Sequence, residues 1–204
     1  MASLSTEGGR PPGRTALAGR AATTHETPGG GKPGLTICEA AHLGKINLRG
    51  DATMLPAVRK HTGCGTLPDN NRIVTVGDRQ IAWLGPDEFL LLCEAGSEAD
   101  LHSQLSLDLG GVHAAVTNVT DSLCVLDLRG AAIRKVLAKG CSLDLHPSKF
   151  TAGDCAQTML AHAGVTLIAQ DEDRFTLICR TSFAPYVADW LMDAGMEYGA
   201  TLKG

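Results

Sequence analysis

The chain has 204 residues and a formal net charge of −4, with a pI near 5.9. This length is sufficient for one domain with a sizeable buried core. The acidic balance and the lack of any Lys/Arg run argue against nucleic-acid binding. The apolar stretches are strand-sized, well below the roughly 20 residues of a membrane-spanning helix.

The seven cysteines indicate a protein whose thiols stay reduced. Their number is odd, and they include no Cys-x-x-Cys pair. Cys93, Cys124 and Cys179 lie inside apolar runs. Buried free thiols of this kind are typical of cytosolic proteins, whereas small secreted proteins pair their cysteines. We therefore expect buried, unpaired cysteines.

Residues 1–34 consist mainly of Gly, Pro, Ala, Thr and Arg, with almost no large apolar side chain. Such a segment cannot bury enough apolar surface to offset the entropy that ordering costs. We expect a disordered N-terminal tail over 1–34 and a single α+β domain over 35–204. The Arg-rich, acid-poor composition leaves an organelle transit peptide as the alternative for the tail.

The first half of the domain is predicted to run strand, helix, hairpin, strand, helix. Ile46 and Leu48 begin a short strand, and the helix after it starts near Thr53, because Pro56 is tolerated only in a first turn. The pattern then predicts a hairpin of two strands at 73–76 and 81–84 and a further strand at 89–93. A second helix is predicted around 101–105.

The second half is predicted to repeat this order after a linking strand over 112–119. Its predicted strands lie at 123–128, 155–161, 165–169 and 175–179. The spacing of Ile133, Val136 and Leu137 predicts the first helix of this half. An amphipathic helix closes it, with apolar residues at 183, 187, 190, 191 and 194.

Two pairs of segments show that the chain carries an internal duplication. Residues 46–50 read INLRG and residues 126–130 read LDLRG, while 87–93 read DEFLLLC and 173–179 read DRFTLIC. These segments follow one another in the same order in both halves. A repeat of this length is a whole βαβ-type unit rather than a short solenoid repeat.

The duplication and the predicted elements together give the expected fold class. Each half has the β-α-β-β-α order of a split βαβ unit. Each helix has one apolar face that must be buried against a sheet. We predict an α+β fold of two pseudo-repeated, ferredoxin-like halves, at about 45–110 and 111–195.

No known type of active site is recognisable in the sequence. The His residues are scattered and do not stand with Cys, Asp or Glu at the spacing of a metal site. The chain has no Gly-x-Ser-x-Gly motif of a hydrolase. The Gly-rich segment 29–33 follows no predicted strand and has Pro where the helix of a phosphate-binding loop would continue.

Two further groups of reactive side chains have structural interpretations. Cys141 follows the end of a predicted helix, where the helix dipole disfavours a thiolate, so we interpret it as structural. The acidic residues at 87–88 and 171–173 occupy matching turns of the two halves and are interpreted as solvated. We predict no catalytic, cofactor-binding or metal-binding residue in this chain.

Several segments resemble the gamma subunit of heterotetrameric sarcosine oxidase. They lie in both halves of the chain, at 47–51, 83–88, 121–130, 137–147, 153–158 and 180–186. The run 139–147, KGCSLDLHP, is the most specific of them, and the resemblance extends from about 46 to 194. That family is similar in turn to the folate-binding aminomethyltransferase fold, so the resemblance implies one aminomethyltransferase-like domain of the folate-binding type.

The resemblance implies a cytoplasmic complex of alpha, beta, gamma and delta subunits. Such a complex demethylates sarcosine oxidatively to glycine, transfers the one-carbon unit to tetrahydrofolate and produces hydrogen peroxide. The resemblance places FAD, FMN, NAD, tetrahydrofolate and zinc on the other subunits. It leaves this chain a structural role, with no active site of its own.

The residues that match the aminomethyltransferase site support this division of roles. Aminomethyltransferases carry an acidic pair on the strand after a Gly-rich hairpin, whereas the matching segment here, 164–168, reads GVTLI. A carboxylate that would bind an amine is therefore absent from that segment. Two alternatives of the same fold remain: a free-standing folate-binding protein and a self-contained aminomethyltransferase.

Four basic residues in or beside the family-like segments are candidates for contact with other subunits. They are Arg129, Lys139, His146 and Arg180. Loops carry recognition more often than strands do, which favours these positions. For each of them a solvated surface role is the alternative, because exposed Lys and Arg are common.

Overall fold

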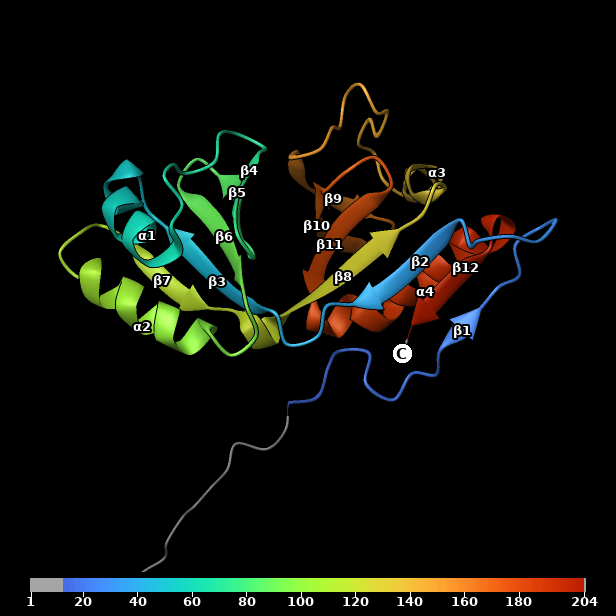
Figure 1. Cartoon of the computed structure of the whole chain (residues 1–204), viewed down its shortest axis with the longest axis horizontal. Helices are drawn as coiled ribbons and strands as arrows, with labels where there is room; N and C mark the ends of the chain where they lie inside the picture. The colour runs from blue at the N-terminus through green and yellow to red at the C-terminus, as the bar shows by residue number, and fades with distance from the viewer. Residues whose placement is uncertain (1–12, 204) are drawn as a thin grey trace, which may run out of the picture.

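The computed structural model describes residues 13–203. Their strands form two sheets, one of seven strands and one of five. Figure 1 shows the two sheets side by side, with helices on the outer side of each. The coarse prediction of a mixed fold of sheets and helices is therefore confirmed.

The five-stranded sheet contains the first half of the domain. Its strand order is β4 (Ile73–Val76), β5 (Arg79–Gly85), β6 (Glu88–Cys93), β3 (Gly44–Arg49) and β7 (Ala115–Asn118). All neighbouring strands in it are antiparallel. Its outer face is covered by the helices α1 (Leu55–Thr62) and α2 (Glu98–Asp108).

The seven-stranded sheet contains the second half and both ends of the described chain. Its strand order is β1 (Thr23–Thr24), β12 (Ala200–Lys203), β2 (Leu35–Glu39), β8 (Leu123–Arg129), β11 (Arg174–Arg180), β10 (Ala163–Ala169) and β9 (Cys155–Leu160). Only β12 and β2 pair in parallel. The helices α3 (Ile133–Ala138) and α4 (Ala184–Gly195) cover its outer face.

Each sheet contains a strand that leads directly into the other sheet. Strand β2 leads directly into β3 of the smaller sheet but pairs with β8 of the larger one. Strand β7 leads into β8 but pairs with β3. This arrangement ties the two sheets together through the backbone.

The apolar side chains form three cores, because successive residues of a strand point to opposite faces. In β6, Leu91 packs beneath α1 and α2, while Leu90 and Leu92 face the other sheet. A second outer core lies beneath α3 and α4. The core between the sheets contains Ala82, Leu90, Leu92, Val125, Cys155, Ile168 and Ile178.

Local signals in the sequence explain where the first helix begins and ends. A short 3-10 helix, η1 (Ala52–Met54), precedes α1, and the Asp51 carboxylate accepts a hydrogen bond from the Thr53 N–H. Pro56 lies in the first turn of α1, as expected. Gly63 ends the helix with a φ of 78°, a left-handed conformation that favours glycine.

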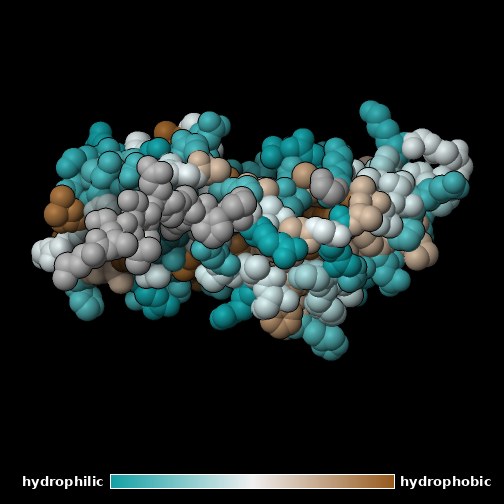
Figure 2. Space-filling model, turned by 90° about the horizontal axis from the view of Figure 1, so that it is seen from below, coloured by the Kyte–Doolittle hydropathy of each residue, from teal (hydrophilic) through white to brown (hydrophobic). Residues whose placement is uncertain are grey.

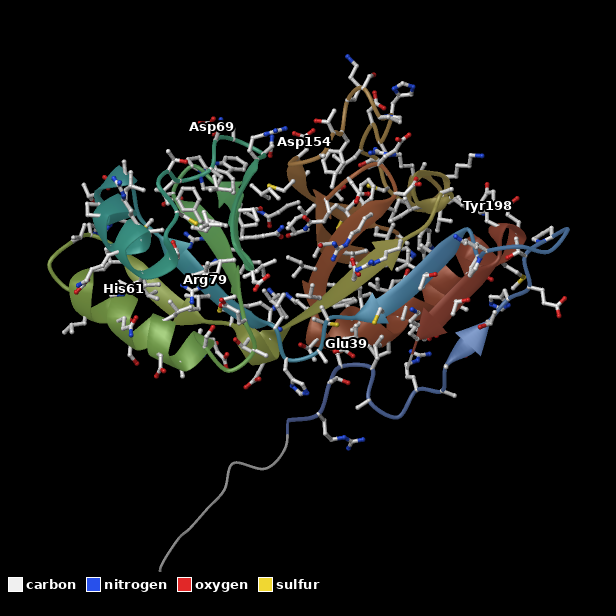
Figure 3. All side chains as sticks on the ribbon, in the orientation of Figure 1. Glu39, His61, Asp69, Arg79, Asp154 and Tyr198 are labelled. Atoms are coloured by element: carbon white, nitrogen blue, oxygen red, sulfur yellow. The ribbon has the colours of Figure 1, made fainter. Side chains whose placement is uncertain are left out.

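Residues 13–34 differ from the disordered tail that we expected; residues 1–12 lie outside the described residues. Leu17 is only 8% exposed. The N–H groups of Ala16 and Leu17 donate to the carboxylate of Glu39, at 2.8 and 2.9 Å, beside the N-terminal segment in Figure 3. Strand β1 pairs with β12. Backbone hydrogen bonds, which composition does not reveal, therefore hold this segment.

The described residues agree with the prediction that the thiols stay unpaired. All seven cysteines are free, and Cys93, Cys124 and Cys179 are buried. No helix within residues 13–203 has the length and apolar character needed to cross a membrane. The face seen in Figure 2 is covered mainly by hydrophilic residues, with separate hydrophobic spots.

Candidate functional site

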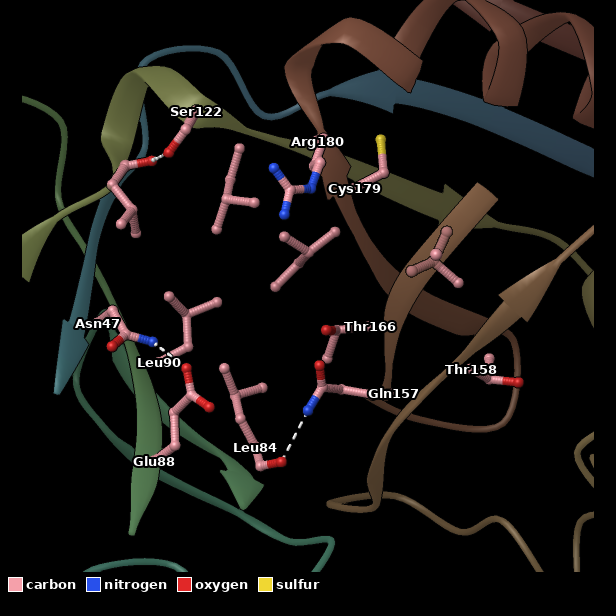
Figure 4. A pocket seen from close by; sticks show the side chains of 15 residues that line it. Asn47, Leu84, Glu88, Leu90, Ser122, Gln157, Thr158, Thr166, Cys179 and Arg180 are labelled. Atoms are coloured by element: carbon pink, nitrogen blue, oxygen red, sulfur yellow. Dashed lines mark hydrogen bonds between the residues drawn. The ribbon is translucent and has the colours of Figure 1, made fainter. Parts of the chain in front are cut away.

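A cleft of about 450 Å³ opens between the two sheets. Its walls come from β3, β5 and β6 of the smaller sheet and from β9, β10 and β11 of the larger one (Figure 4). The short 3-10 helix η2 (Thr120–Ser122) and the start of β8 close one end. The polar residues that line it include Asn47, Glu88, Gln157, Thr166 and Arg180.

Glu88 is the cleft-lining residue that carries a carboxylate, and that carboxylate is already bonded. It accepts hydrogen bonds from Asn47 Nδ2 at 2.8 Å and from Arg49 at 2.7 Å. The register of β3 and β6 places Arg49 directly opposite Glu88. Asp87 lies in the turn and is exposed, as interpreted, whereas Glu88 begins β6 directly after the turn and its partly exposed side chain lines the cleft.

Arg180 contributes a positive charge on the opposite wall. It is the last residue of β11, it is exposed, and its guanidinium points into the cleft (Figure 4). Within residues 13–203, this guanidinium takes part in none of the ion pairs. The charge of Glu88 is offset by Arg49, so the cleft carries a local excess of positive charge.

Strand β10 lines the cleft without any acidic side chain. Gly164 and Thr166 lie on the cleft wall, while Leu167 is buried in the outer core beneath the helices. This is the segment that matches the acidic strand of aminomethyltransferases. The described residues of the cleft therefore offer no free carboxylate to bind an amine or to act as a general base.

The thiols of Cys124 and Cys155, near the cleft, are not activated nucleophiles. A hydrogen bond with Cys179, burial and the neighbouring Glu39 carboxylate all raise the pKa of the Cys124 thiol. Burial raises the pKa of Cys155 to about 11. Because the thiolate is the reactive form, these side chains are inert at neutral pH. Within residues 13–203, no group of three or more His, Cys, Asp and Glu side chains is arranged to hold a metal ion.

The structure places the four candidate contact residues far apart. Arg180 faces Leu123 across the β8–β11 pair, whereas Arg129 lies at the other end of that pair and donates to Asp127 at 2.7 Å. Asp127 lines a second pocket of about 380 Å³ between the sheets.

Lys139 and His146 lie outside the cleft. The Lys139 ammonium donates to the Ala194 carbonyl and lies 5.0 Å from the centre of the Tyr198 ring, near the end of α4. His146 lies in an exposed loop, with its Nδ1 2.8 Å from Ser148 Oγ. Arg180 is therefore the one candidate that lines the cleft.

Lys45 crosses from one sheet to the other and is only 4% exposed. Its ammonium donates to the Leu123 carbonyl at 2.9 Å. Burial lowers the pKa of Lys45 below 10.5, and nearby acidic groups offset part of this shift. Between the lowered pKa and 10.5 the unfolded chain binds more protons than the folded chain, so stability must rise with pH there.

Lys45→Met should remove this pH dependence. We expect the free energy of unfolding of the wild-type chain to rise as the pH approaches 10.5, and that of the variant to stay flatter, as measured by urea unfolding at a series of pH values. Exposed Lys149 offers the control, and Lys149→Met should keep the wild-type profile. Parallel profiles for the wild type and Lys45→Met would contradict the burial of this ammonium.

Comparison with known proteins identifies the family. A family model described as sarcosine oxidase, gamma subunit family, matches residues 49–197. The gamma subunit of sarcosine oxidase from Corynebacterium sp. (strain U-96) is 32% identical over 173 residues, which cover 83% of this chain and 83% of that protein. The family match spans both halves of the chain.

Two solved structures are similar to the described fold. A chain of heterotetrameric sarcosine oxidase from Corynebacterium sp. U-96, in complex with pyrrole 2-carboxylate, has a TM-score of 0.77 and 32% identity, over 85% of this chain and 88% of that chain. The glycine cleavage system aminomethyltransferase T from Bartonella henselae has a TM-score of 0.64 and 15% identity, over 85% of this chain and 48% of that chain, which shows the shared fold alone. The resemblance found in the sequence is confirmed, and this chain belongs to the sarcosine oxidase gamma subunit family.

Proposed function

We propose that this chain is the structural gamma subunit of a cytoplasmic, heterotetrameric sarcosine oxidase. Its partners are the alpha, beta and delta subunits. The assembly demethylates sarcosine oxidatively to glycine, transfers the one-carbon unit to tetrahydrofolate and produces hydrogen peroxide. The family match over 49–197 is the observation that carries this proposal.

The chain supports the assembly without an active site of its own. The cleft-lining carboxylate, Glu88, is held by Asn47 and Arg49, and the cleft wall at Gly164 and Thr166 carries no acid. Raised pKa values keep the thiols of Cys124 and Cys155 protonated. We therefore assign FAD, FMN, NAD, tetrahydrofolate and zinc to the other subunits.

Co-expression of this chain with the other three subunits tests the proposal. We expect the chain to co-purify with them in a fixed ratio, and the purified chain alone to show no turnover of sarcosine. Omission of the chain should lower the yield of active oxidase. A well-folded chain that never co-purifies with the other subunits would refute the proposed role.

A folate-binding protein of the same fold is the second candidate. The cleft volume of about 450 Å³ falls within the range of small-molecule pockets, and Arg180 offers a positive charge to a carboxylate. Calorimetry of the isolated chain with tetrahydrofolate decides this case, since the absence of heat at millimolar ligand would remove it. The acid-free cleft wall at Gly164 and Thr166 stands against the third candidate, a self-contained aminomethyltransferase.

We also infer that residues 35–204 form one domain of two pseudo-repeated, ferredoxin-like halves. Strand β3 with α1, β4, β5, β6 and α2 has the same order as β8 with α3, β9, β10, β11 and α4. Gly50 donates to the Asp87 carbonyl at 2.9 Å, and Gly130 donates to the Asp173 carbonyl at 2.9 Å. Each bond joins the end of the first duplicated segment of a half, 46–50 or 126–130, to the start of the second, 87–93 or 173–179. This equivalence supports boundaries near 45–110 and 111–195.

Of the four candidate contact residues, Arg180 has the strongest case for a subunit contact. Arg129 is bonded to Asp127, His146 to Ser148, and Lys139 to the Ala194 carbonyl. These three side chains would have to exchange existing partners, or share them, on binding another subunit. We keep them as secondary candidates.

A further inference from the structure

We propose that the cleft between the sheets is a docking slot for an extended, acidic segment of a partner subunit, with Arg180 binding a carboxylate of that segment. This inference rests on the proposed role of the chain as a subunit. It adds the surface that makes the contact and the chemistry of the segment that occupies it.

The first observation is the charge of the cleft. The Arg180 guanidinium points into the cleft (Figure 4), and it takes part in none of the ion pairs among the described residues. Glu88, on the opposite wall, is already neutralised by Arg49 at 2.7 Å. A carboxylate from outside the chain is therefore the complementary group, and arginine can bind it through two parallel hydrogen bonds.

The second observation is the apolar rim beside the cleft. Met159 is 51% exposed and lies opposite Gly164 in the register of β9 and β10. Phe183 is 40% exposed and lies in the short helix η3 (Thr181–Phe183), three residues after Arg180. Methionine, aromatic residues and arginine are the types enriched at protein interfaces.

The rim favours a protein segment over a small carboxylate as the occupant. Neither Met159 nor Phe183 lines the cleft, so a small molecule bound inside would leave both side chains in water. A partner segment that contacts Arg180 and continues across η3 and β9 would cover both of them. Burial of this apolar surface adds the hydrophobic contribution that a single ion pair at an exposed site lacks.

The cleft wall at Gly164 leaves room for such a segment. A Cβ atom added at Gly164 would meet no heavy atom within 4 Å, and the backbone there has no positive φ. A side chain at this position would therefore project into open space without straining the strand. Gly164→Phe offers a way to fill the slot while all charges stay in place.

The test compares variants within the complete complex. Arg180→Glu should weaken assembly by about 30-fold or more, the size expected for loss of a central arginine contact. Arg180→Lys should recover part of the loss, and Gly164→Phe should weaken assembly without any change of charge. The readout is the concentration at which the diluted complex dissociates, measured by mass photometry.

The matched control is Arg59→Glu, a charge reversal at an exposed arginine of α1 on the outer side of the smaller sheet. It should assemble as the wild type does.

A benzophenone analogue of phenylalanine at position 183 should cross-link to a partner segment that contains Asp or Glu. Thermal unfolding of each isolated variant checks that it folds.

Two results would overturn the inference. One is that the complexes with Arg180→Glu and with Gly164→Phe both dissociate at the same concentration as the wild-type complex. The other is a cross-link that falls on a second copy of this chain or on a partner segment without acidic residues. Failure of the wild-type chain itself to assemble would instead refute the proposed function, so the two failures are distinguishable.

Discussion

Gly130→Ala should destabilise the folded chain by about 3 kcal/mol or more. Gly130 has a φ of 134°, which L side chains rarely adopt. A Cβ atom at this position would lie 2.2 Å from the Gly34 carbonyl oxygen and 2.7 Å from its carbon. Neither backbone atom can move freely, because the Gly34 carbonyl accepts from Ala132 and the Gly34 N–H donates to Tyr198. Urea unfolding of the full chain measures the loss.

Gly164→Ala is the matched control for this prediction. Its added methyl group meets open space on a strand of ordinary backbone conformation, so the free energy of unfolding should change by no more than about 0.5 kcal/mol. An unchanged unfolding midpoint for Gly130→Ala would show that the segment around Gly34 does not pack against the end of β8. The variant therefore also tests how the chain enters the larger sheet.

The sequence predicted those elements whose pattern is local. Strands β6 and β11 were predicted because each is a short apolar run that follows a turn, at 89–93 and at 175–179. The helix after β3 was also predicted, because Pro56 and Gly63 mark its first turn and its end. Such signals require no knowledge of what the element packs against.

Elements that depend on distant partners were not predicted. Strand β2 pairs with β8 and with the C-terminal strand β12, and β1 pairs with β12. Nothing in residues 35–39 points to partners that lie far along the chain. The ordering of residues 13–34 depends on the same pairings, together with the carboxylate of Glu39.

The candidate site was predicted only in part, for a similar reason. Arg180 was selected from the family-like segments, and it does line the cleft. Glu88 and Asn47 meet because β3 and β6 pair within one sheet, and they lie opposite Arg180 only because the two sheets pack against each other. The packing of one sheet on another depends on the shapes of both sheets. The sequence pattern of a strand can indicate which of its faces is apolar, but it does not indicate which other element that face packs against.

Phe175→Ala should cost about 3–5 kcal/mol of folding stability, the usual range for removing a buried aromatic ring. Phe175 is fully buried on β11. Its ring stacks on Phe150, with 6.0 Å between the ring centres, and the Arg134 guanidinium lies 4.9 Å from its centre. Arg134 also donates to the Leu145 and Phe150 carbonyls, so this ring anchors the loop that carries the family-like run 139–147.

The loss should therefore be both global and local. Urea unfolding should show the lower stability, and amide hydrogen exchange should speed up around Leu145 and Phe150 more than in α1 or α2, which pack in a separate core. Phe183→Ala is the control, because its ring is 40% exposed and the stability of the isolated chain should change by less than about 1 kcal/mol. Equal losses for the two variants would contradict the packing of Phe175, since only a buried ring leaves a cavity when it is truncated.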